Sequence, residues 1–179
     1  MATTAAAVKN GLLTALFPDG DSAERGYQAC IERGYEIGDV NVLVSEGTRK
    51  KLVEDESGIK SKLAERKAEG GELGGPKGGR AGILMTIFAA AGAAIAIPAL
   101  GVVAGPIAVA LTAAGAAGAA AGLISAFSDW GVPADRVRRY ESAIKKGSIL
   151  VVVETRNAED ARQIAEDWNE LGAHDIFYR

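Results

Sequence analysis

The sequence is poor in the side chains on which most enzyme sites are built. Among its 179 residues it has one histidine, His174, and one cysteine, Cys30. A Ser-His-Asp triad or a His/Cys metal site would therefore have to be assembled from single copies. The P-loop pattern, Gly-Lys followed by Ser or Thr after a strand, is also missing. These absences predict a non-enzymatic protein with no cofactor and no metal site.

Basic charge is not in excess either. Twenty Lys and Arg against 23 Asp and Glu give a formal net charge of -3 and a pI near 5.3. Because nucleic-acid affinity depends on a basic face that contacts phosphates, we expect no nucleic-acid partner. A single cysteine cannot form an internal disulfide, and the initial MATTAAAVKNG has neither the basic nor the apolar region of a signal peptide. The expected location is the cytoplasm.

Charge of either sign is absent from one long stretch. No Asp, Glu, Lys or Arg occurs from Ala81 to Ser128, and Ala, Gly, Ile, Leu and Val dominate there. A helix that spans a bilayer needs about 20 apolar residues, so this segment is long enough for two. We expect helices over Ala81–Ile97 and Ile107–Phe127, which together form an apolar helical hairpin. The residues of the expected turn are Pro98, Gly101, Gly105 and Pro106.

Small residues recur on one face of the second expected helix, and they would let two backbones approach closely. The members of this expected packing seam are Ala114, Gly115, Gly118, Gly122 and Ala126. The hairpin is therefore expected to associate with copies of itself, in a lipid bilayer or in a sealed oligomeric core. A hairpin buried by the chain's own sheet is the alternative, although four short strands offer little surface to cover two helices of about 30 Å.

Two residues that flank the apolar segment, Arg80 and Trp130, are the expected anchors at a membrane interface. Further basic residues lie near both ends of the hairpin, among them Lys77, Arg136, Arg138 and Arg139. Because positive charge favours the cytoplasmic side, the rest of the protein is expected to lie on that side of any membrane it contacts.

The two flanking regions predict an α+β domain built from two βαβ halves. Four short apolar runs read as strands: Leu12–Phe17, Val40–Val44, Ile149–Val153 and Asp175–Tyr178. Two split βαβ units are the parts of a ferredoxin-like sheet. In the runs Leu12–Phe17 and Ile149–Val153, apolar residues occupy both sets of alternating positions and hence both faces of the strand, which favours central neighbours. The other two runs have polar interruptions that favour edges.

Helices are expected between the strands of each half. In the first, Asp21 and Glu24 have the spacing of a capping box, and Gly34 stands where the helix would end. In the second, Asn157 begins a helix that ends at Gly172. The expected inward-facing residues are Ala23, Tyr27, Cys30, Ile31, Ala161, Ile164, Ala165, Trp168 and Leu171. A short helix with Val137, Tyr140 and Ile144 on one face should precede the second half.

These elements divide the chain into four parts. Residues 1–46 form the first half of the domain, and residues 47–80 a charged helix followed by a glycine-rich linker. Residues 81–128 form the apolar hairpin, and residues 129–179 the second half. The linker could be taken for a phosphate-binding loop, but the required Gly-Lys-Ser/Thr order is absent.

Several segments carry a family resemblance, namely Ala15–Glu24, Ile97–Pro106, Gly131–Asp135 and Lys146–Val153. Together with the uncharged centre, they resemble the bacterial general-stress-protein family with a glycine-zipper-like hydrophobic hairpin between two βαβ halves. The resemblance implies no catalytic residues. This chain departs from it in the long spacer from Glu46 to Gly79 and in Trp130.

The sequence therefore predicts a non-enzymatic stress-type protein that self-associates, or associates with membrane, through its apolar hairpin and forms a homo-oligomer. The alternative is a membrane-anchored ferredoxin-like module whose sheet face senses a small ligand. Convergent polar groups on the sheet would favour that alternative.

Overall fold

The computed structural model describes residues 11–36, 39–52, 54, 94–97, 101–104, 124, 127, 128 and 130–179. Helices and strands alternate along these ranges, and residues 46–52 form a further helix after β2. The main elements are β1 (Gly11–Phe17), α1 (Gly20–Glu32), β2 (Val40–Val44), β3 (Ala94–Ile97), β4 (Gly101–Ala104), α6 (Ala134–Lys145), β5 (Ile149–Thr155), α7 (Ala158–Glu170) and β6 (His174–Tyr178). The α+β class is confirmed.

The strands form one antiparallel sheet in the order β3-β4-β2-β5-β1-β6. β1 pairs with β5 along its whole length, from Gly11 opposite Thr155 to Phe17 opposite Ile149. The expectation that these two apolar runs are central neighbours is therefore confirmed. β6 lies at an edge, as its polar residues indicated.

Three expectations are wrong where the structure describes the residues concerned: the end of the first apolar helix, Gly101 as a turn residue and Val40–Val44 as an edge strand. Residues 94–97 are strand β3 and not the end of a helix over Ala81–Ile97, and Gly101 begins β4 and is paired with Ile97. β4 pairs with β2, so Val40–Val44 is an interior strand and not an edge. Residues 94–97 and 101–104 form strands because this part of the apolar segment is rich in β-branched residues, with Ile95, Ile97, Val102 and Val103 on either side of Pro98.

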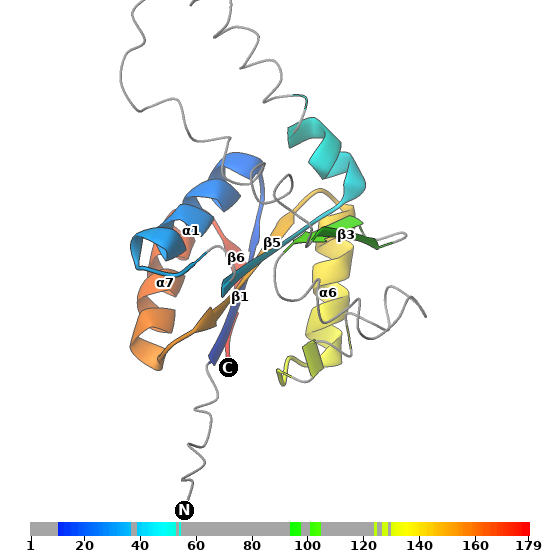
Figure 1. The fold of residues 1–179 in the computed structure, drawn as a ribbon. Helices are drawn as coiled ribbons and strands as arrows, with labels where there is room; N and C mark the ends of the chain where they lie inside the picture. Colours follow the sequence, from blue (N-terminus) through cyan, green and yellow to red (C-terminus); the bar gives the residue numbers. More distant parts are fainter. Residues whose placement is uncertain are drawn as a thin grey trace, which may run out of the picture.

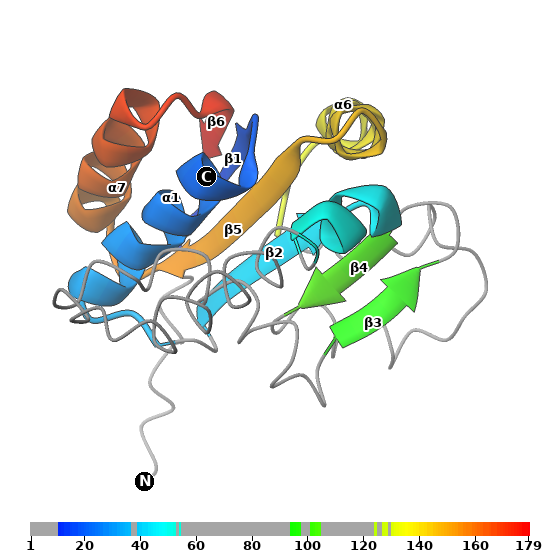
Figure 2. The same cartoon turned by 90° about the horizontal axis from the view of Figure 1, so that it is seen from above.

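Helices cover both faces of the sheet. Figures 1 and 2 show α1 and α7 side by side against one face, and α6 against the other. The alternation of side chains along the central strands explains the three layers. In β5, Ile149, Val151 and Val153 belong to the core beneath α1 and α7, whereas Leu150 and Val152 belong to the core beneath α6.

The layer of α1 and α7 packs tightly around Gly26 and Trp168. The Trp168 indole Nε1 donates a hydrogen bond of 2.8 Å to the Gly26 carbonyl oxygen, and the Trp168 ring meets Phe17 edge to face at 5.6 Å. A Cβ atom at Gly26 would lie 2.3 Å from the Phe17 ring, so this position requires glycine. The apolar faces expected for both helices are confirmed, with Tyr27, Cys30 and Trp168 fully buried.

The ends of the helices agree with the sequence except at one cap. α1 is capped by Asp19, whose carboxylate accepts from the Ser22 backbone N–H at 2.8 Å, and not by the expected Asp21. α7 is capped by Asn157, which accepts from the Asp160 N–H at 2.8 Å. Gly34 and Gly172 follow the helices with φ of 80° and 81°, a conformation that glycine adopts without strain.

Candidate functional site

The apolar segment joins the sheet domain at two described places, and the first is the edge of β2. Val42, Leu43 and Val44 pair with Ala104, Val103 and Val102 of β4. β3 then pairs with β4, from Ala94 opposite Ala104 to Ile97 opposite Gly101. Part of the uncharged segment therefore satisfies its backbone hydrogen bonds by extending the sheet of the folded domain.

The second attachment lies beside α6, where the apolar segment ends. Phe127 is 1% exposed and packs edge to face with Trp130 and Tyr140, at centroid distances of 6.2 and 6.3 Å. The Val132 N–H donates to the Phe127 carbonyl at 2.9 Å, which closes the turn into α6. Ile124 and Trp130 are partly buried against the same core. The end of the segment is thus held by the layer that α6 forms.

The residues predicted for association fall into two groups. Trp130 is half-buried against Phe127, and Gly101 is a strand residue. The others lie outside the described residues: Arg80, Pro98, Gly105, Pro106, Ala114, Gly115, Gly118, Gly122 and Ala126. No helix in the described part of the chain has both the length and the apolar character that crossing a membrane requires.

A buried polar contact that the sequence did not indicate links the sheet to α6. The hydroxyl oxygens of Thr14 and Tyr140 lie 2.6 Å apart, and these residues are 0% and 1% exposed. Thr14 Oγ1 also donates to the Phe177 carbonyl at 3.4 Å. Burial raises the pKa of Tyr140, against the opposing effect of its hydrogen bonds with Thr14 and Arg136, so the phenol is neutral.

The contact continues into an ion pair between α6 and the edge strand. Arg136 Nη1 lies 2.5 Å from Asp175 Oδ1, and its guanidinium stacks 4.3 Å from the centroid of the Phe177 ring. Asp175 has φ of 52°, and the pairing of β6 with β1 shifts register at this point. Such a bulge interrupts an edge strand and makes it a poorer template for another strand. Arg136 and Asp175 therefore have a structural explanation.

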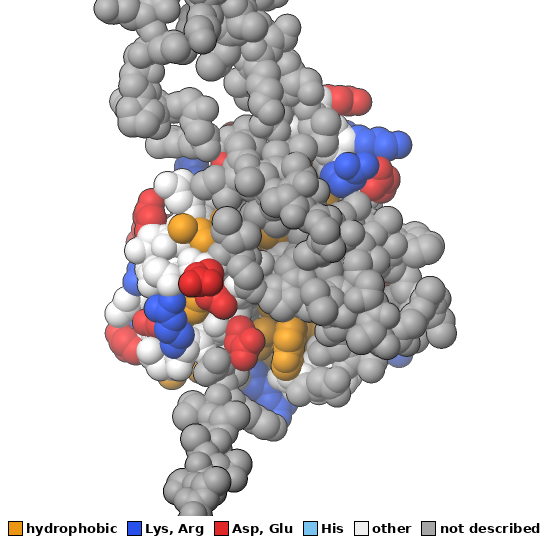
Figure 3. All heavy atoms as spheres, viewed as in Figure 1, with side chains coloured by type: hydrophobic (Ala, Val, Ile, Leu, Met, Phe, Trp, Pro, Cys, Tyr) orange, Lys and Arg blue, Asp and Glu red, His pale blue; other side chains and the backbone are white. Residues whose placement is uncertain are grey.

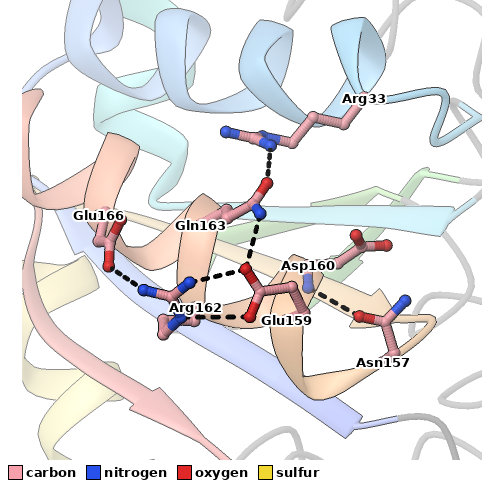
Figure 4. A network of polar contacts seen from close by, with 7 residues as sticks. All are labelled: Arg33, Asn157, Glu159, Asp160, Arg162, Gln163 and Glu166. Carbon is pink, nitrogen blue, oxygen red and sulfur yellow. Dashed lines mark hydrogen bonds and ion pairs between the residues drawn. The ribbon is translucent and has the colours of Figure 1, made fainter.

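A second polar network fastens α1 to α7 on the opposite face (Figure 4). Arg33 donates to Asp167 Oδ2 at 2.6 Å and to Gln163 Oε1 at 2.7 Å. Gln163 Nε2 donates to Glu159 at 2.8 Å, and Glu159 also pairs with Arg162 at 2.6 Å. Glu159 and Asp160 lie in the first turn of α7, where negative charge offsets the positive end of the helix dipole.

Tyr35 extends the connection to the loop after β5. Its hydroxyl donates to Asp160 Oδ2 at 3.0 Å and accepts from the Arg156 N–H at 3.1 Å. The Arg156 guanidinium lies 4.3 Å from the centroid of the Tyr35 ring and also donates to the Gly34 carbonyl. Tyr35, Asp160 and Arg156 thus form hydrogen bonds between different elements, and these bonds have a structural role.

The lone cysteine and histidine lie apart and in different environments. Cys30 is fully buried, and burial raises the pKa of its thiol to about 12, so it is an unreactive core residue as expected. His174 is exposed in the edge strand β6. Within the described ranges, no group of three or more His, Cys, Asp or Glu side chains is placed to hold a metal ion.

A shallow depression of about 300 Å³ lies on α1 near the end of α7, and its lining residues are Arg25, Gln28, Ala29, Glu32 and Leu171. The sheet face opposite α1 and α7, where a ligand-sensing module would bind its ligand, is packed against α6 through Leu16, Leu150 and Val152. Buried polar side chains also lie at that face, and two of them, Thr14 and Tyr140, are hydrogen-bonded to each other.

Comparison with known proteins adds no relative to these observations. A scan against protein-family models, a search of curated proteins and a search of solved structures each gave no match.

Proposed function

We propose that β2, β5, β1 and β6, with α1 and α7, form a ferredoxin-like domain into which the apolar segment is inserted. Two arguments support this. The four strands are antiparallel neighbours in the order β2-β5-β1-β6, and each βαβ half places its helix on the same face. β3 and β4 extend this sheet beyond β2, and α6 covers its second face.

We further propose that the chain is a non-enzymatic stress-type protein of the cytoplasm that self-associates, or associates with membrane, through its apolar segment. The single observation that carries this proposal is the absence of charge over the 48 residues from Ala81 to Ser128. Soluble monomers rarely expose apolar patches larger than a few hundred Å². The described attachments at β2 and α6 involve one pair of short strands and the C-terminal end of the segment.

The seam of small residues is the proposed contact between copies. Ala114, Gly118, Gly122 and Ala126 recur every four residues, so in a helix they lie on one face. Small side chains at that spacing permit close backbone packing, whether the surroundings are lipid or the interior of an oligomer. The product is a homo-oligomeric assembly whose sheet domains remain on one side.

Substitution at the seam tests the proposal. Gly118→Leu should reduce the size of the assembly, because the larger side chain separates backbones that only small residues allow to meet. Ala116→Leu is the matched control, because it adds a leucine about 200° away around the same helix. Sedimentation velocity on both variants reports the assembly, and circular dichroism reports the sheet domain. Equal particle sizes for wild type and Gly118→Leu would remove the seam from the proposal.

A further inference from the structure

The charged side chains of the described domain segregate between its two helical layers. α7 carries five acidic residues and one arginine, and α1 carries three acidic residues and one arginine. In contrast, α6 with its C-terminal cap Lys146 carries five basic residues and two acidic ones. In Figure 3 red acidic side chains are scattered over the visible α1 and α7 layer. Although the protein has a net charge of -3, α6 is therefore a basic helix, as is the helix over residues 46–52 with Arg49, Lys50 and Lys51.

The helical period places most of this positive charge on the outer side of α6. Val137, Tyr140 and Ile144 face the sheet and are each 1% exposed. The basic residues of the outer side are Arg138, Arg139, Lys145 and Lys146, all of them exposed. The side chains of Arg138 and Arg139 are 69% and 58% exposed and have ion-pair distances of 3.4 and 3.6 Å to Asp135 and Asp175. Such exposed pairs are weak and exchange readily for other anions.

The acidic layer does not cancel this field. The sheet separates α6 from α1 and α7 (Figure 2), and the screening length in physiological salt is about 8 Å. Exposed charges on opposite sides of the sheet therefore interact weakly through the solvent. An anionic surface that approaches α6 meets its exposed basic side chains together with Asp135 of the same helix.

The apolar segment ends shortly before α6 and contacts the side of this helix that faces the sheet. Phe127 packs on Trp130 and on Tyr140, whereas the exposed basic residues lie on the outer side of the same helix. We propose that the outer face of α6 binds anionic lipid headgroups and orients the domain on the bilayer with which the apolar segment associates. This inference rests on the membrane association proposed above. Basic residues next to a membrane-associated segment strengthen its attachment to anionic lipid about fivefold each.

Flotation of the intact chain with lipid vesicles tests the inference, because vesicles rise in a density gradient whereas protein assemblies do not. The probes are vesicles of phosphatidylcholine alone and vesicles with about one-quarter phosphatidylglycerol. Arg138→Gln/Lys146→Gln should bind the anionic vesicles about 25-fold more weakly than wild type, and high salt should have a similar effect. The charge-conserving Arg138→Lys/Lys146→Arg should restore binding.

Arg25→Gln/Arg162→Gln is the matched control, since it removes the same charge from α1 and α7 and should leave binding unchanged. Equal losses in both glutamine variants, or no loss in the α6 variant, would overturn the inference. Equal flotation of wild type and all variants with both kinds of vesicle would overturn it while leaving association through the apolar segment intact. Flotation with neither kind of vesicle would overturn both membrane proposals. Salt-sensitive binding to a single-stranded oligonucleotide instead of vesicles would assign the face to nucleic acid.

Discussion

Thr14 and Tyr140 share a buried hydrogen bond of 2.6 Å between their hydroxyl oxygens, which joins the central strand β1 to α6. Both residues are almost inaccessible to solvent. The bond crosses from the sheet to the layer that holds Phe127 at the end of the apolar segment. This hydrogen bond therefore connects the sheet with the layer next to the apolar segment, through which we propose that the protein associates.

Removal of this bond should measurably weaken the domain. Tyr140→Phe leaves the ring packing in place but removes the hydroxyl group, so the free energy of unfolding should fall by about 1 kcal/mol. Urea-induced unfolding followed by circular dichroism measures the change. Tyr178→Phe is the matched control, because Tyr178 is 42% exposed and should be nearly neutral. A loss in Tyr178→Phe equal to that in Tyr140→Phe would contradict the assignment.

A charge in the middle of the sheet should abolish folding. Val151 is 0% exposed in β5, between β1 and β2, so Val151→Asp would bury an unpaired carboxylate. The cost of several kcal/mol is comparable with a total stability of about 5 to 15 kcal/mol. Glu154→Asp, at an exposed position of the same strand, should retain the wild-type thermal transition. A cooperative transition in Val151→Asp would show that this position is not central.

Alkaline pH should destabilise the domain through Cys30. Burial raises the pKa of its thiol from 9.0 to about 12, so above pH 9 the unfolded chain releases a proton that the folded chain retains. This contribution to stability is complete below pH 9 and is lost as the pH rises toward 12. The loss between pH 9 and about 10.5 should be about 1.5 kcal/mol.

Cys30→Ala should reduce this loss of stability at alkaline pH. Part of the loss should remain, because burial also raises the pKa of Tyr27 to about 12. Parallel urea titrations of wild type and Cys30→Ala from pH 8 to 10.5 check the difference. Identical slopes would mean that Cys30 is not the group responsible.

The sequence predicted the central strands because Leu12–Phe17 is apolar except at Thr14 and Ile149–Val153 is apolar throughout, a pattern typical of strands covered on both faces. It predicted α6 from the spacing of Val137, Tyr140 and Ile144, but not the face that this helix covers, since periodicity carries no information on partners. The mistake over β2 has the same origin. Its outer neighbour β4 comes from a segment about 60 residues later in the chain, which strand composition alone does not indicate.

The apolar segment was harder to predict, because a long uncharged run satisfies the length criterion for a helix whatever its periodicity. The clusters of β-branched residues at Ile95–Ile97 and Val102–Val103 were the available signal for strands, and it was outweighed by the surrounding alanines. The contact between Arg136 and Asp175 joins residues that are 39 positions apart, so no local sequence pattern predicts it. The pattern of hydrophobic residues also does not predict the left-handed conformation of Asp175.

The mass of the particle formed by the intact chain without detergent tests the central claim most directly. Multi-angle light scattering coupled to size exclusion provides this mass together with its dispersion. We predict that the purified protein is recovered as a homo-oligomer or only together with lipid, because the uncharged segment needs a cover that one copy does not supply. A monodisperse, lipid-free particle of 18.4 kDa would contradict the account, because the segment would then be covered within a single chain.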